Sequence, residues 1–123
     1  MKIEVIYLLR QNEFEKVLAD WATDKNIDYK QVNIDDDNLT ETVDGIVIFH
    51  ENHNFNKETL ELHDSLTKHN KLSYKVDING TLAATSSNFK MWVDRNKAKK
   101  LLFLGDNAVA QNENFERFLK HIC

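Results

Sequence analysis

Two histidines are the side chains best placed for metal chemistry. His50 and His53 follow an apolar run that begins at Ile46. Imidazoles three residues apart can share a borderline metal such as zinc, with a carboxylate from another loop completing the coordination sphere. His-x-x-His also arises by chance, and no second pair of ligands accompanies it. We therefore predict no metal or other cofactor and interpret His50 and His53 as loop histidines.

A wider set of polar side chains follows the apolar runs that we expect to be strands. In open α/β sheets, ligands bind beyond the carboxyl ends of the strands, where the strand order reverses. The candidates at these positions are Arg10, Asn12, Asp35, His50, Glu51, Asp106 and Asn107. They offer a cation, carboxylates, an imidazole and amides, the mixture that a polar small-molecule site uses. We predict that a small-molecule ligand, if the protein takes one, binds among these residues.

Three consecutive aspartates, Asp35 to Asp37, raise two more specific interpretations. A contact to the ribose of a dinucleotide would require a glycine-rich phosphate loop after the first strand, and Arg10-Gln11-Asn12 stands there instead. A magnesium pocket resembling that of response-regulator receivers would require acidic residues after the first strand and an aspartate in place of His50. We interpret the aspartates as a solvated loop that ends an edge strand.

Arg10 and Asn12, at the end of the first predicted strand, carry a family resemblance. Over about a dozen residues the chain resembles the start of a TIR domain or of a nucleoside deoxyribosyltransferase. These are small α/β domains that act on nicotinamide or nucleoside glycosidic bonds. The resemblance implies a catalytic glutamate in the pocket, for which Glu51 and Glu58 are the candidates; the residues alone assign no catalytic group.

The hydrophobic pattern divides the chain into alternating strands and helices. Strands are predicted at 3–9, 28–34, 46–49, 72–78 and 101–104, and helices at about 13–25, 57–69, 86–100 and 112–122. The runs at 3–9 and 46–49 are apolar throughout, as in parallel strands buried on both faces. Asn12 with Glu15 resembles a capping box, and Asn56 is a second predicted cap.

This order of elements predicts one α/β domain over residues 1–123. We expect a three-layer flavodoxin-like or Rossmann-like fold, with an open, mostly parallel sheet of about five strands and helices on both faces. Asn79-Gly80 is a strong signal for a type I′ turn, which predicts a return strand at Thr81–Thr85 and an added β-hairpin at 72–85. Tyr74 and Leu82 would then share an exposed face suited to a dimer contact.

Composition limits the function classes. The 123 residues include 16 Lys and Arg against 20 Asp and Glu, for a net charge of −4, which argues against nucleic-acid binding. No apolar stretch is long enough for a membrane span. A single cysteine, Cys123, excludes an intramolecular disulfide and fits the cytoplasm.

Two functional interpretations remain open. The first is a small cytoplasmic interaction or regulatory domain without catalysis, which binds a protein partner or a second copy of itself. The alternative is an enzyme or sensor that handles nucleotides or nucleosides, with a polar site at the carboxyl ends of the strands.

Overall fold

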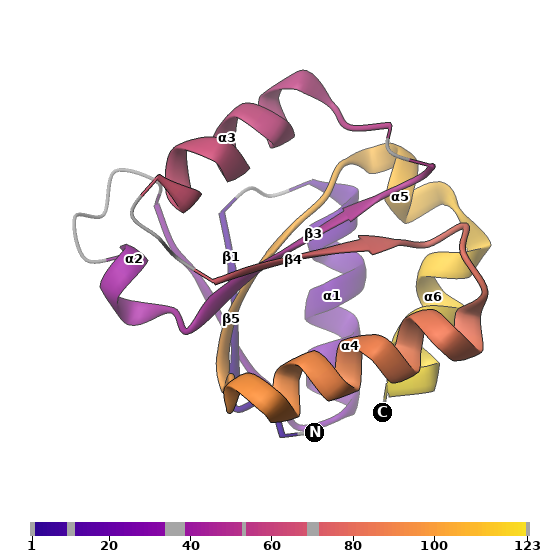
Figure 1. Ribbon diagram of the computed structural model, residues 1–123, viewed down its shortest axis with the longest axis horizontal. Coiled ribbons are helices and arrows are strands. Elements are labelled where there is room, and N and C mark those ends of the chain that lie inside the picture. Colours follow the sequence, from indigo (N-terminus) through magenta and orange to yellow (C-terminus); the bar gives the residue numbers. More distant parts are fainter. Residues whose placement is uncertain (1, 10–11, 34–38, 53, 69–71, 123) are drawn as a thin grey trace.

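The apolar runs of the sequence form the strands of a parallel sheet (Figure 1). The computed structural model describes residues 2–9, 12–33, 39–52, 54–68 and 72–122. The strands are β1 (Val5–Leu8), β2 (Asp28–Gln31), β3 (Gly45–His50), β4 (Ser73–Asp77) and β5 (Lys100–Leu104). They lie in the order β2-β1-β5-β3-β4, and every neighbouring pair is parallel.

Helices cover both faces of this sheet (Figure 1). The helices are α1 (Glu13–Asp24), α2 (Leu39–Thr42), α3 (Lys57–Thr67), α4 (Leu82–Asn96), α5 (Asn107–Gln111) and α6 (Glu113–Ile122). The larger core cluster joins one sheet face to α1, α4, α5 and α6, and the smaller cluster joins the other face to α2 and α3. The expected three-layer α/β fold is confirmed.

Side-chain alternation along the central strands explains their continuous hydrophobicity. In β3, Val47 and Phe49 belong to the larger core cluster, whereas Ile46 and Ile48 belong to the smaller one. All six residues of this strand are buried. Because successive side chains of a strand point to opposite faces, a strand that is covered on both sides needs apolar residues at every position.

The predicted hairpin at 72–85 is wrong. Thr81 precedes the first turn of α4, and the Thr85 amide donates to the Thr81 carbonyl at 2.8 Å. Neither Asn79 nor Gly80 has the positive φ that a type I′ turn requires. Helical spacing buries Phe89 and Val93 of the same segment in the larger core, so tertiary packing outweighs the local turn signal. The sheet is consequently parallel throughout rather than mixed.

The expected exposed face on that hairpin is also absent. Tyr74 is half-buried, and its ring stacks on Trp92 with centroids 5.1 Å apart. Leu82 packs against the larger core. The short helices α2 and α5 were not predicted, because a single turn is too brief to show a 3.6-residue period. Among the described helices, none is long and apolar enough to cross a membrane.

Candidate functional site

The carboxyl ends of β1, β3 and β5 open onto two adjoining cavities. The first has a volume of about 420 Å³ and is lined by Asn12, Asn56, Glu58, Asp106, Asn107 and Ala108. The second has a volume of about 330 Å³ and is lined by Glu51, Asn52, Asn54, Phe55, Asn56, Asn79, Asp106 and Ala108. Because the two share Asn56, Asp106 and Ala108, we treat them together and name them the carboxyl-end crevice.

Asn12 fixes the start of α1 beside the end of β5. Its Oδ1 accepts from the Glu15 amide at 3.0 Å, and its Nδ2 donates to the Gly105 carbonyl at 3.2 Å. Gly105 is required for this close approach, since a Cβ there would lie 2.4 Å from the ring of Phe14. The predicted cap is confirmed, and the side chain also forms one wall of the crevice.

Asp106 and Asn107 hold the opposite wall. The Asp106 Oδ1 accepts from the Val109 amide at 3.2 Å and caps α5, whereas the Asn107 Oδ1 accepts from the Glu13 amide at 3.1 Å. These bonds use one oxygen of each side chain. The Asp106 Oδ2 and the Asn107 Nδ2 have no hydrogen-bond partner within the part of the chain that the structure describes.

The start of α3 supplies the third wall. The Asn56 Oδ1 accepts from the Glu58 amide at 2.9 Å, as expected for a helix cap. Its Nδ2 and the exposed Glu58 carboxylate make no hydrogen bond to the described residues. The crevice therefore offers amide donors and carboxylate acceptors that no described residue uses.

Glu51 belongs to an asparagine network at the far side of the second cavity. The Asn112 Nδ2 donates to the Glu51 Oε2 at 3.0 Å and to the Asn79 Oδ1 at 2.8 Å. Asn114 donates to the same Asn79 oxygen at 3.3 Å. The bonds join the ends of β3 and β4 to the start of α6, and they hold this wall in place.

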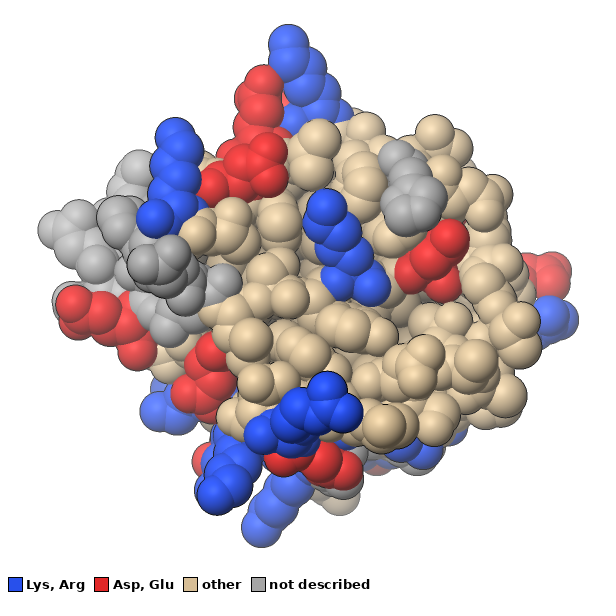
Figure 2. Space-filling model, viewed as in Figure 1, with Lys and Arg blue, Asp and Glu red and all other residues tan. Residues whose placement is uncertain are grey.

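The charged side chains among the described lining of the crevice are all acidic. The crevice carries the carboxylates Glu51, Glu58 and Asp106, and none of its described lining residues is a lysine or arginine. Figure 2 shows few charged side chains on the right-hand side of the molecule, where β3 and β4 end. Among the described lining residues, amide side chains, which carry no net charge, outnumber the carboxylates.

The remaining predicted site residues lie elsewhere. His50 is 2% exposed, with its ring 4.7 Å from that of Phe55, and it lines neither cavity. Arg10, Asp35 and His53 lie outside the described residues. Within the described ranges, no group of three His, Cys, Asp or Glu side chains is arranged to hold a metal ion.

Sequence reasoning missed part of the lining. Asn56 was predicted as a cap but not as a site residue, although a cap that follows a strand must lie at the carboxyl edge. Asn79 follows a strand in the same way, and the expectation of a hairpin concealed its position. Asn112 follows no strand, so no local signal could place it beside Glu51.

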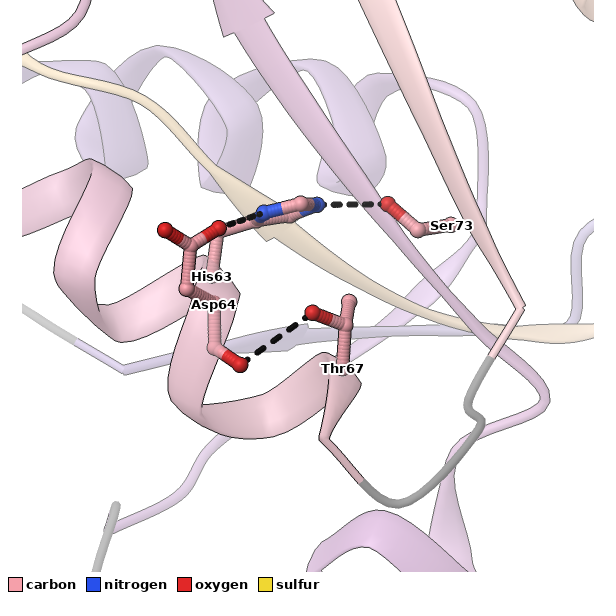
Figure 3. Close-up of polar contacts among 4 residues, drawn as sticks. All are labelled: His63, Asp64, Thr67 and Ser73. Atoms are coloured by element: carbon pink, nitrogen blue, oxygen red, sulfur yellow. Dashed lines mark hydrogen bonds and ion pairs between the residues drawn. The ribbon is translucent and has the colours of Figure 1, made fainter.

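A Ser-His-Asp arrangement lies at the other end of β4 (Figure 3). The buried His63 contacts the Ser73 Oγ through Nε2 at 2.6 Å and the Asp64 Oδ1 through Nδ1 at 3.2 Å. This is the connectivity of a catalytic triad, but a triad also needs a substrate cavity at the hydroxyl and donors for an oxyanion. Ser73 is not among the lining residues of the carboxyl-end crevice. The contacts instead satisfy a buried imidazole and tie α3 to β4.

A larger cavity, of about 570 Å³, lies between α1 and α6. Its apolar lining is Val17, Trp21 and Leu119, and side chains of both signs, including Asp20 and Lys120, surround it. None of its lining residues lies in a loop that follows a strand, and its charged residues belong to α1, to α6 or to the position directly after α1. Each of the two cavities that form the carboxyl-end crevice is smaller, but the crevice has the convergent polar groups that a specific site requires.

Comparison with known proteins supports the fold. No family model matches the chain, and neither does any curated protein. Among solved structures, the crystal structure of a protein from Syntrophus aciditrophicus, described as a "putative molybdenum carrier protein", is similar with a TM-score of 0.73. The likeness covers 98% of this chain and 92% of that one at 14% sequence identity. At this identity it shows a shared α/β architecture and no shared activity.

Proposed function

We propose that this chain is a non-catalytic binding domain, a sensor or carrier, which holds a small uncharged polar ligand of the nucleoside class in the carboxyl-end crevice. The observation that carries the proposal is a set of polar groups there that have no hydrogen-bond partner among the described residues. The Nδ2 atoms of Asn56 and Asn107 are donors, and the carboxylates of Asp106 and Glu58 are acceptors. A ligand that matches them must carry hydrogen-bond acceptors and hydrogen-bond donors close to one another.

A nucleoside has this pattern. Its ring nitrogens can accept from the amides, and its ribose hydroxyls and exocyclic amine can donate to the carboxylates. The cavity of about 420 Å³ also falls within the usual range of small-molecule sites. The expected cytoplasmic location, inferred from the single cysteine, agrees with such a ligand.

Anionic ligands fit the described lining less well. The amino ends of α1 and α3 face the crevice and would attract an anion, but acidic residues already occupy their first turns. Glu51, Glu58 and Asp106 would also repel a phosphate. We therefore favour nucleosides over nucleotides and over an oxyanion of molybdenum, the element in the description of the structural neighbour.

Thermal unfolding with adenosine, uridine, AMP and molybdate as separate probes tests this proposal. A ligand at a hundred times its dissociation constant adds about 2.7 kcal/mol, which corresponds to a rise of roughly 10 °C in Tm for a domain near this size. We expect adenosine to give the largest rise, because its exocyclic amine can donate to a carboxylate. A rise with molybdate or AMP but with neither nucleoside would overturn the proposal.

A matched pair of variants locates the binding. Asp106→Asn keeps a capping side chain but replaces the unused acceptor by a donor, so the adenosine-dependent rise should disappear. Glu61→Gln removes a carboxylate from the exposed face of α3, away from the crevice, and should leave the rise intact. An equal rise in the wild type and in Asp106→Asn would place the ligand elsewhere.

Catalysis on the bound nucleoside is the second candidate. Glu51 and Glu58, which the resemblance to nucleoside deoxyribosyltransferases implies as catalytic candidates, both line the crevice. Release of free base from adenosine or deoxyadenosine, lost in Glu58→Gln, would replace the non-catalytic interpretation with an enzymatic one. Binding without base release would retain the proposal.

A further inference from the structure

Strand β4 forms one edge of the sheet and has hydrogen-bonding groups that face outward. The Ile46 amide donates to the Leu72 carbonyl at 2.9 Å, and the Ile78 amide donates to the His50 carbonyl at 3.0 Å. Because the backbone groups of a strand alternate in direction, Ser73, Lys75 and Asp77 direct their amides away from β3. In Figure 1 none of the described helices and strands lies beyond this edge.

The surroundings of the edge are mainly uncharged. Tyr74 and Trp92 stack beside it on the α4 side, both half-buried, and Phe55 lies on the α3 side with the Lys75 Nζ 5.6 Å from its ring centroid. Figure 2, in the same view, shows few charged side chains over the middle of this face. Docked against another surface, these rings would lose much of their remaining exposure.

The sequence of β4 is complementary to itself in one antiparallel register. A two-fold axis at Val76 would place Lys75 opposite Asp77 of a second copy, twice, with both residues at hydrogen-bonding positions. An axis at Lys75 would instead place two lysines opposite each other. A lysine at an exposed edge ordinarily discourages pairing, but in the Val76 register its charge is compensated.

We propose that two copies of this chain dimerise by antiparallel pairing of their β4 strands about a two-fold axis at Val76, which joins the two sheets into one. Tyr74, Trp92 and Phe55 flank the paired strands on either face. The two copies meet along the β4 edge of the sheet and not at either end of the strands, so the carboxyl-end crevice of each copy stays open. The proposal is independent of the ligand.

The other edge of the sheet is the natural comparison. All four residues of β2 are exposed, so this strand lacks half-buried rings to flank a pairing. Its Lys30 has the same residue type as Lys75 and also lies in the middle of an edge strand. Lys30→Glu is therefore the matched control for Lys75→Glu.

Sedimentation velocity over a concentration series, under reducing conditions, tests the dimer. The 14.4-kDa chain should sediment at twice its mass as concentration rises. In the Lys75→Glu variant a negative side chain would face Asp77 of the second copy in both pairs. The repulsion should raise the dimer dissociation constant about tenfold or more. Lys75→Arg, which keeps the positive charge, should preserve association, and Lys30→Glu should not affect it.

Three outcomes would overturn the proposal. They are a wild-type monomer up to millimolar concentration, a dimer that tolerates Lys75→Glu, or a dimer that dissociates on Lys30→Glu. Circular dichroism of each variant checks that the fold is retained, which we expect because both lysines are exposed.

Discussion

Three polar side chains that line the carboxyl-end crevice each have two functions. In Asn56, Asp106 and Asn107 one side-chain oxygen accepts a backbone amide, and the other polar atom remains available to a ligand. Helix capping thus fixes the orientation of the group that would bind. The same residue types that serve as helix caps therefore also line the site.

The two functions of Asp106 can be separated by substitution. Asp106→Ala removes the cap of α5 and should lower the free energy of unfolding by about 1 kcal/mol, whereas Asp106→Asn should preserve most of it. Urea denaturation of the two variants measures the difference. Equal losses would show that the contact to the Val109 amide does not stabilise the helix.

Tyr74 should make stability depend on alkaline pH. Burial raises the pKa of its hydroxyl above the ordinary value of 10.0. The folded state then binds this proton more tightly than the unfolded state does, so the stabilisation is complete below pH 10.0 and is lost as pH rises through the higher folded pKa. The free energy of unfolding of Tyr74→Phe should fall less steeply above pH 10.0 than that of the wild type. Parallel curves for the two proteins would contradict this assignment.

At the scale of the elements, the contact between β5 and α1 depends on a glycine. A Cβ at Gly105 would lie 2.4 Å from the Phe14 ring, which is fully buried and packs on Phe49 and Phe115. Gly105→Ala should therefore reduce the free energy of unfolding by about 1–3 kcal/mol through overpacking. The change should be visible as a lower Tm.

Gly80→Ala is the control for that measurement. Its Cβ would meet the Thr85 Oγ1 at 3.0 Å, a side-chain atom that can rotate away. We expect a smaller loss of stability than in Gly105→Ala. The reverse order would show that the end of β5 can shift away from α1.

Sequence patterns predicted the structure correctly where it depends on one helix or strand alone. They failed where contacts between elements determine the conformation. The apolar runs predicted β3 and β5, and the capping residues Asn12 and Asn56 predicted the starts of α1 and α3. The Asn79-Gly80 signal failed because Phe89 and Val93 bury the segment as a helix. Likewise, Asn79 and Asn112 meet through the fold of the whole chain, so no spacing in the sequence could bring them together.

At the scale of the whole molecule, the strand order places the chemistry. β5, the last strand in the sequence, lies between β1 and β3, so the loops after three distant segments converge. The flavodoxin-like or Rossmann-like expectation anticipated a crevice at this edge, but it could not specify which loops would meet. The likeness to the Syntrophus protein shows that a sequence only 14% identical can form the same α/β fold.

Mapping of backbone amide chemical shifts in the labelled protein during an adenosine titration tests the central claim most directly. The account predicts that the shifted resonances belong to the carboxyl-end crevice, with Asn56, Glu58, Asn107 and Ala108 among them. Shifts confined to the groove between α1 and α6, at Val17, Lys25 and Leu119, or no shifts at any adenosine concentration, would contradict it.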